Sequence, residues 1–217
     1  MKEQIIKEIE EQKIVAILRG VPAEKLLQLA EALYAGGIRL LEITFSADKS
    51  VSDEETARRI GLLCDHFAGK MAIGAGTVLT TEQVKLTKAA GGSFIICPNV
   101  DADVIELANE LGMVTIPGAL TPTEIVQAHN AGADFVKLFP VAQLGVDYVK
   151  AVKAPLSHIK MLAVGGINTD NMPQYLETGI CGFGIGANIA DKKLIDSCDW
   201  QAITENAMEY RRVIGCG

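Results

Sequence analysis

Short apolar runs alternate along the whole chain with longer stretches of helical periodicity. Apolar runs bounded by turn residues are typical of strands buried on both faces, whereas apolar residues at every third or fourth position indicate one face of a helix. The predicted strands are Ile14–Leu18, Ile38–Phe45, Met71–Ala75, Ser93–Cys97, Met113–Ile116, Phe135–Phe139, Ile159–Val164 and Phe183–Ile185. The predicted helices are Ala23–Ala35, Asp53–Phe67, Thr81–Ala90, Asp101–Leu111, Pro122–Ala131, Val146–Lys153, Asn171–Glu177 and Trp200–Ile214.

This order of elements predicts a parallel sheet. Glycine follows most of the predicted helices, as in Gly36-Gly37 and Gly91-Gly92, where it can adopt the left-handed conformation that ends a helix. Eight strand–helix units in 217 residues favour a closed (β/α)₈ TIM barrel. An open doubly wound sheet is less favoured because no Gly-x-Gly-x-x-Gly follows the first strand. Residues 1–217 are therefore interpreted as one α/β barrel domain, preceded by a short amphipathic helix carrying Ile5 and Ile9.

Charge, hydropathy and cysteine content indicate which partners and cellular compartment to expect. The net charge is −7 and no basic cluster is present, so nucleic acid is not an expected partner. No apolar run approaches the roughly 20 residues that span a bilayer, and the first residues lack a signal-peptide pattern. The cysteines are few, odd in number and widely spread: Cys64, Cys97, Cys181, Cys198 and Cys216. That spread indicates reduced thiols in a cytoplasmic protein rather than a disulfide framework.

No metal site or cofactor is expected. The three histidines are His66, His129 and His158. They fall in helices or helix-to-strand connections, away from the strand ends that carry barrel active sites. They also lack the spacing of metal ligands, so metal-assisted chemistry is not predicted.

Two ionisable residues interrupt predicted strands. Lys137 lies in the middle of Phe135–Phe139, and Glu42 lies in Ile38–Phe45. Side chains alternate across a strand, so Lys137 shares a face with the two phenylalanines at the ends of its run. Burial lowers the pKa of a lysine, and an uncharged amine can attack a carbonyl to form a Schiff base. The alternative is that Lys137 and Glu42 form a buried structural ion pair.

Further polar residues and glycines stand at or near the carboxyl ends of other strands. Arg19 follows the first strand and Thr77 the third. Gly165-Gly166 and Gly186 follow the seventh and eighth, where many barrels bind phosphate through backbone N–H groups. Taken singly, each residue also fits a plainer reading, such as a rim arginine, a helix cap or a tight turn. Together they predict a polar pocket at one mouth of the barrel.

These residues belong to motifs that resemble a known family. The relevant runs are Lys13–Arg19, Leu41–Phe45, Gly74–Val78, Pro117–Glu124 and Lys137–Pro140. They are similar, in the same order, to those of the 2-keto-3-deoxy-6-phosphogluconate / 4-hydroxy-2-oxoglutarate aldolases. The resemblance implies a class I aldolase, usually a homotrimer, that splits a 2-keto-4-hydroxy acid into pyruvate and an aldehyde such as glyceraldehyde 3-phosphate or glyoxylate.

The same resemblance implies roles for single residues. Lys137 would form the Schiff base, Glu42 would be the general acid and base, and Thr77 would contact the pyruvyl group. Arg19 would hold the distal anionic end of the substrate with Gly165 and Gly166. The resemblance further places four residues at substrate-binding positions: Thr44, Ser46, Pro98 and Phe139.

Three positions depart from the best-known members. Val164 and Ala187 replace hydroxyl residues in the distal pocket, and Ser46 replaces an arginine of some members. Losing hydroxyls weakens the expectation of a phosphorylated substrate. The Val164-Gly165-Gly166 loop also resembles the aldolases acting on the galactonate epimer, although those have proline in place of Thr44. The residues are also compatible with a non-catalytic barrel that binds a phosphate ligand, and with an isomerase or synthase barrel that uses Glu42 as its base.

Overall fold

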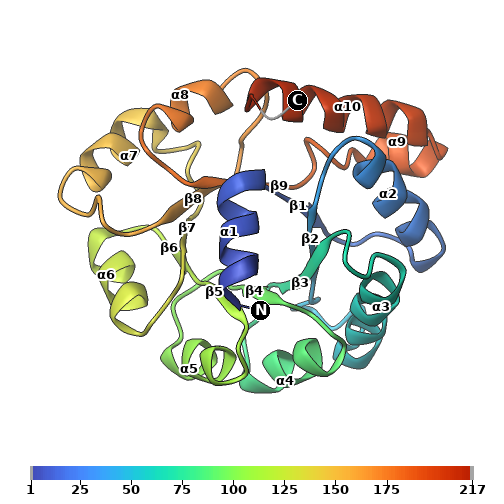
Figure 1. Cartoon of the computed structure of the whole chain (residues 1–217), viewed down its shortest axis with the longest axis horizontal. Helices are drawn as coiled ribbons and strands as arrows, with labels where there is room; N and C mark the ends of the chain where they lie inside the picture. Colours follow the sequence, from blue (N-terminus) through green and yellow to red (C-terminus); the bar gives the residue numbers. More distant parts are fainter. Residues whose placement is uncertain (1, 216–217) are drawn as a thin grey trace.

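Nine parallel strands form a ring that is surrounded by helices (Figure 1). The structure, a computed structural model, describes residues 2–215. The strands are β1 Ile14–Leu18, β2 Leu40–Thr44, β3 Ala72–Gly76, β4 Phe94–Ile96, β5 Val114–Ile116, β6 Gly118–Ala119, β7 Val136–Leu138, β8 Met161–Val164 and β9 Gly182–Ile185. The helices are α1 Lys2–Gln12, α2 Ala23–Ala35, α3 Asp53–His66, α4 Thr81–Ala89, α5 Ala102–Glu110, α6 Pro122–Asn130, α7 Gly145–Lys153, α8 Met172–Leu176, α9 Lys192–Ser197 and α10 Trp200–Val213. The predicted α/β barrel with a leading helix is confirmed.

The barrel closes through a strand that proline divides in two. In the sheet order, β5 and β6 stand at opposite ends, yet only Pro117 separates them along the chain. Proline has no N–H, so this position cannot donate to a ladder. The carbonyl of Pro117 still accepts a hydrogen bond from the backbone N–H of Lys137 at 2.8 Å. β5 therefore pairs with β4 and β6 with β7, and together they occupy the place of one barrel strand.

The amino-terminal end of the barrel is filled with apolar side chains. An interior cluster joins Val15, Leu40, Phe94, Phe135 and Leu162 to Ile9 of α1, among others. Figure 1 shows α1 lying across the middle of the ring. Two ion pairs attach this helix, between Lys2 and Asp134 at 2.9 Å and between Lys160 and Glu10 at 2.8 Å. With this end sealed, a ligand can enter the barrel only at the carboxyl ends of the strands.

Local signals in the sequence fix most helix starts. Ser52, Thr80 and Asp101 cap α3, α4 and α5 by accepting backbone N–H groups of the first turn. Thr121 and Glu124 form a reciprocal capping box at α6. The short helix α9 was not predicted. Within the described residues, no helix is long and apolar enough to cross a bilayer.

Candidate active site

Glu42 and Lys137 both lie inside the barrel, as the alternation of side chains predicts. Glu42 on β2 is 1% exposed and Lys137 on β7 is 6% exposed. Both line a cavity of about 660 Å³ at the carboxyl ends of the strands. The apolar cluster beneath them seals the barrel floor, so both ionisable groups face a pocket with one entrance.

Glycines on the neighbouring strand make room for Glu42. Gly74 and Gly76 of β3 pair with Glu42 and Thr44 of β2. A Cβ atom at Gly76 would lie 1.6 Å from Oε1 of Glu42, and one at Gly74 would lie 2.4 Å from the ring of Phe94. Two consecutive inward positions therefore have to be glycine because large neighbouring side chains fill their space.

Gly76→Ala is expected to lower turnover by at least about ten-fold and to destabilise the fold by about 1–3 kcal/mol, because overpacking forces neighbours off their rotamers. Steady-state kinetics and the thermal unfolding midpoint measure these effects. The matched control is Gly61→Ala in α3, where the nearest atom to the new Cβ is 3.7 Å away. Helix propensity should make that change neutral or stabilising. Equal behaviour of the two variants would contradict the tight contact between Gly76 and Glu42.

Burial moves the pKa values of the two ionisable groups toward each other. Desolvation raises the pKa of Glu42, and the charges of Lys137 and Arg19 oppose that shift. Desolvation likewise lowers the pKa of Lys137, and attraction to Glu42 opposes it. The amine lies 4.6 Å from the ring centre of Phe139. Desolvation is the largest effect on the pKa of Lys137, and it favours the uncharged form that can act as a nucleophile.

The pair is not held as a closed ion pair. No salt bridge within 4.0 Å joins Glu42 to Lys137 among the described side chains. Oε2 of Glu42 is buried and has no hydrogen-bond partner in residues 2–215. Buried polar atoms are nearly always paired, so an unpaired one facing a cavity marks a group available to a ligand. This geometry disfavours a purely structural ion pair.

Arg19 and Thr77 meet at the rim of the same cavity. Nη2 of Arg19 lies 3.4 Å from Oγ1 of Thr77, across 58 residues of sequence. Thr77 has a φ of 55°, a left-handed conformation that is unfavourable for a β-branched residue. Such strain is typical of functional positions, where surrounding structure enforces it. The arginine side chain is exposed to solvent and can contact a ligand.

Two glycine-containing loops form another part of the cavity wall. Gly165 and Gly166, with φ of 96° and 78°, follow β8, and Gly186 and Ala187 follow β9. Their four backbone N–H groups donate no hydrogen bond to any residue between 2 and 215. Adjacent free N–H groups at left-handed positions can bind an anion. These donors are therefore available to a ligand that enters the cavity.

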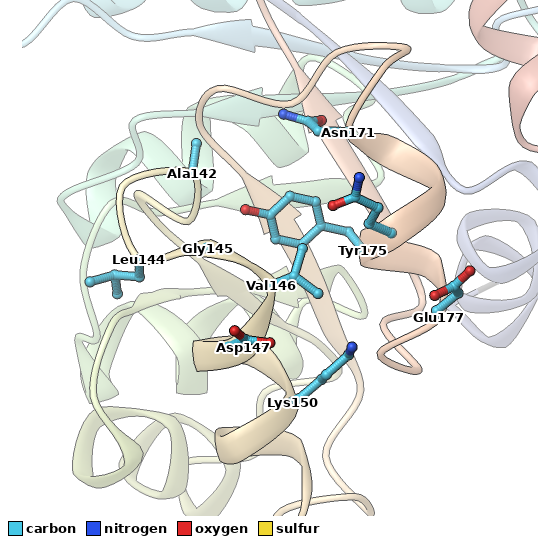
Figure 2. A pocket seen from close by; sticks show the side chains of 10 residues that line it. Ala142, Leu144, Gly145, Val146, Asp147, Lys150, Asn171, Tyr175 and Glu177 are labelled. Atoms are coloured by element: carbon cyan, nitrogen blue, oxygen red, sulfur yellow. The ribbon is translucent and has the colours of Figure 1, made fainter.

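The diglycine loop is braced from α8. The Asn171 side chain donates to the carbonyl of Gly166 and accepts from the N–H of Asn168, both at 2.9 Å. The N–H of Ala142 donates to the carbonyl of Gly165 at 3.1 Å. Figure 2 shows Asn171 beside a second cavity, of about 620 Å³, lined by residues of α7, α8 and the segment before α7. The helices therefore fix the loop from outside the barrel mouth.

The remaining predicted site residues divide into two groups. Pro98 and Phe139 line the mouth cavity. Thr44 and Ser46 instead line a much smaller neighbouring pocket, together with Thr56 and other residues. Thr44 is the last residue of β2 and still pairs with Gly76 of β3, whereas Ser46 follows the end of the strand. Neither Thr44 nor Ser46 is among the residues that line the cavity of Lys137.

Residues of α9 were missed in the sequence. Lys192, Ile195 and Asp196 line the mouth cavity, as does Asn188 in the preceding loop. A signal is present, since Asp191 is a helix-capping residue placed before an apolar pair. The helix is too short for its periodicity to be detected.

No histidine or cysteine of residues 2–215 lines this cavity. His66 contacts Glu31 at 3.1 Å, and the rings of His129 and His158 contact each other at 5.4 Å. Among the described residues, no group of three His, Cys, Asp or Glu could hold a metal ion. Four cysteines are free thiols, and Cys216 lies outside the described residues.

The chain is similar to known proteins over most of its length. The model of the family described as "KDPG and KHG aldolase" matches residues 5–206. A Rhizobium meliloti protein named "Probable 2-dehydro-3-deoxy-6-phosphogalactonate aldolase" is 39% identical over 180 residues, 82% of each chain. The 2-dehydro-3-deoxy-phosphogluconate aldolase of Haemophilus influenzae is 35% identical over 98% of this chain and 97% of its own.

A solved structure agrees with these relatives. The KDPG aldolase of Legionella pneumophila, with pyruvate captured as a covalent carbinolamine intermediate, superposes with a TM-score of 0.83. It is 28% identical, and the match covers 96% of this chain and 97% of that one. The family match covers most of the chain and includes every strand of the barrel. The chain therefore belongs to the KDPG and KHG aldolase family.

Proposed function

We propose that this chain is a class I aldolase that cleaves a phosphorylated 2-keto-3-deoxy sugar acid into pyruvate and glyceraldehyde 3-phosphate through a Schiff base on Lys137. The observation that carries the proposal is one pocket holding a buried, pKa-lowered lysine and a buried carboxyl group with a free oxygen. Free N–H groups of the two glycine loops support a distal phosphate. 4-Hydroxy-2-oxoglutarate, with a carboxylate in place of that phosphate, is a second acceptable substrate.

The reaction follows from the properties of the two groups. Uncharged Lys137 attacks the C2 ketone, and loss of water gives a protonated imine. Glu42 removes the proton of the C4 hydroxyl, directly or through a water, and the C3–C4 bond breaks as its electrons enter the imine. The aldehyde leaves, Glu42 returns a proton to C3 of the enamine, and water hydrolyses the imine to free pyruvate and the amine. A carboxyl group that both takes and gives protons works best with a pKa raised toward neutrality.

The other site residues have roles at the two ends of the substrate. Thr77 contacts the pyruvyl group, with Phe139 and Pro98 against its apolar part. Arg19, Gly165 and Gly166 hold the distal anion. Thr44 and Ser46, which line the smaller neighbouring pocket, are assigned no contact with the substrate. A homotrimer in the cytoplasm remains our expectation from the family resemblance.

The galactonate epimer is a second candidate substrate. Relatives named phosphogalactonate aldolases from Rhizobium meliloti and Escherichia coli are 39% and 36% identical to this chain. Val164, which precedes the diglycine loop, lines the mouth cavity with an apolar side chain. Cleavage rates on both C4 epimers, each with and without phosphate, decide between these substrates.

The test of the proposed chemistry is reductive trapping. Incubating the protein with pyruvate and sodium borohydride should add one pyruvyl group per chain, seen as a single mass increase of the intact protein. Because reduction needs an imine, a protein that remains unlabelled is not a class I aldolase of pyruvate. The same result would separate the aldolase from a non-catalytic phosphate-binding barrel and from an isomerase.

Activity is expected to rise with pH along one acidic limb. The active form needs Lys137 uncharged and Glu42 ionised, so protonating either group at low pH removes activity. Burial lowers the pKa of Lys137 and raises that of Glu42, so the midpoint of kcat/KM should fall between the free values of about 4.3 and about 10.4. Because the groups interact, this midpoint belongs to the pair. A midpoint near 10 would mean that the lysine keeps its ordinary pKa.

A further inference from the structure

We infer that Lys192 of α9 is a second cation, in addition to Arg19, that binds the distal phosphate of the substrate and sets the preference for phosphorylated over unphosphorylated keto acids. This inference rests on the proposed aldolase function and adds a residue and a selection mechanism to it. Lys192 lies outside the sequence motifs that carry the family resemblance.

The first support is the position of Lys192. It lines the mouth cavity together with Ile195 and Asp196 of the same helix. α9 follows the loop of Gly186 and Ala187 and so belongs to the strand–helix connection that carries free backbone donors. Asn188 donates to the carbonyl of Ile167 at 2.7 Å and joins this loop to the one after β8. Lys192 thus lines the same cavity as both glycine loops.

α9 is held firmly at the rim. Asp191 caps its start by accepting from the N–H groups of Lys193 and Leu194. At its other end, Nζ of Lys25 donates to the carbonyls of Ile195 and Asp196 at 3.0 and 2.9 Å. A helix fixed at both ends presents Lys192 to the cavity in a constant place, while its flexible stem can still reach a ligand.

The second support is charge. A phosphate monoester carries about −1.5 to −2 charges at pH 7, and backbone N–H groups supply only partial charges against it. Three cationic residues line this cavity within residues 2–215, namely Arg19, Lys137 and Lys192. Lys137 is buried at the reacting centre, and Arg19 is engaged with Thr77. Lys192, whose ammonium pairs with Asp196 of the same helix, therefore adds a second cation beside Arg19 outside the reacting centre.

The two glycine loops also lack side-chain hydroxyl groups beside their glycines that could bind the phosphate in place of this cation. Val164 and Ala187, the residues beside the glycines in each loop, carry no hydroxyl that could donate to phosphate. A lysine is a good point charge for phosphate where bidentate hydrogen bonding is not required. In this chain, the charge of Lys192 takes the place of side-chain hydroxyls.

Asp196 is the internal competitor for Lys192. Their side chains form a salt bridge at 2.6 Å, and both residues line the cavity. Exposed pairs one helical turn apart contribute little to stability, so Lys192 can exchange the carboxylate for a phosphate at small cost. The carboxylate also repels an incoming phosphate. Removing the charge of Asp196 should therefore strengthen binding, the opposite of removing the charge of Lys192.

The experiment measures cleavage of a 2-keto-3-deoxy-6-phospho sugar acid and of the same acid without phosphate. Lys192→Gln should raise KM for the phosphorylated acid by about ten-fold, the loss of one charge-assisted contact, and leave kcat and the unphosphorylated acid unchanged. Asp196→Asn should lower the KM for the phosphorylated acid. The matched control is Lys193→Gln, an exposed lysine next in sequence that does not line the cavity; it should behave as wild type.

Inhibition by inorganic phosphate gives an independent reading of the same subsite. Its Ki should rise in Lys192→Gln by the same factor as KM and stay constant in Lys193→Gln. Equal kinetics of Lys192→Gln and Lys193→Gln, an equal loss on both substrates, or a wild-type protein without preference for the phosphorylated acid would overturn the inference. Trapping of the wild-type protein with pyruvate and borohydride distinguishes failure of this inference from failure of the proposed function. If the wild type is labelled, any of these results refutes only the role of Lys192. If the wild type is not labelled, the aldolase function itself is refuted.

Discussion

Lys137→Ala is expected to abolish covalent trapping of pyruvate and to reduce aldol cleavage to background. The amine of this lysine is the only atom in the proposed reaction that bonds to substrate, and alanine offers no nucleophile in its place. Burial lowers the pKa of Lys137, which favours the uncharged, nucleophilic form of the amine. Intact mass after borohydride reduction measures the adduct directly, and a coupled assay for pyruvate measures cleavage.

The control for this variant is Lys150→Ala. Lys150 is an exposed lysine of α7 that lines the second cavity, outside the barrel mouth (Figure 2). That variant should take up one pyruvyl group and cleave substrate at the wild-type rate. A Lys137→Ala protein that is folded and still labelled would assign the Schiff base to another lysine and remove the basis of the mechanism.

Glu42→Gln should separate adduct formation from turnover. The amide keeps nearly the same shape but cannot accept the C4 hydroxyl proton or return a proton to the enamine. General acid–base catalysis contributes about 10²- to 10⁴-fold, so kcat should fall by that factor while borohydride still traps pyruvate on Lys137. Single-turnover trapping and steady-state cleavage, measured on the same preparation, give both quantities. Turnover near that of wild type would assign proton transfer to a different group.

The same substitution has an expected effect on stability. Desolvation raises the pKa of Glu42, so the folded state holds this proton more tightly than the unfolded chain does. The stabilising contribution of the protonated carboxyl is complete below the unfolded value of about 4.3 and is lost as pH rises through the folded value. At neutral pH the wild type therefore bears the penalty of a buried carboxylate, which glutamine lacks. Unfolding midpoints should show Glu42→Gln no less stable than wild type at pH 8 and relatively less stable at pH 4.

The barrel itself could be predicted because its signals are local. Apolar runs near strand length, helical periodicity between them and glycine after the helices are properties of short segments. The division of one strand by Pro117 was missed, since the sequence does not reveal that the carbonyl of a proline can continue a ladder. α9 was missed because six residues are too few to show a helical period.

In the candidate site, too, side-chain directions within strands could be predicted from neighbouring residues, whereas those in loops could not. The alternation of side chains along a strand predicts that Glu42 and Lys137 point into the barrel. In the structure both are buried and line the mouth cavity. Ser46 lies beyond the end of β2, and neither it nor Thr44 lines the mouth cavity. Beyond a strand's end, side-chain direction depends on loop conformation and no longer on parity.

The sequence by itself determined the order of strands and helices, the inward direction of the reactive lysine and its carboxyl partner, and the family. Tertiary structure alone decided which strand ends share one pocket: it joined Arg19 to Thr77 and placed Lys192 in the lining of a cavity that two glycine loops also line. It also decided that one oxygen of Glu42 stays unpaired. The reason is physical: strand pleating and helix period are set by neighbouring residues, whereas barrel closure and desolvation arise only when segments far apart in sequence pack together.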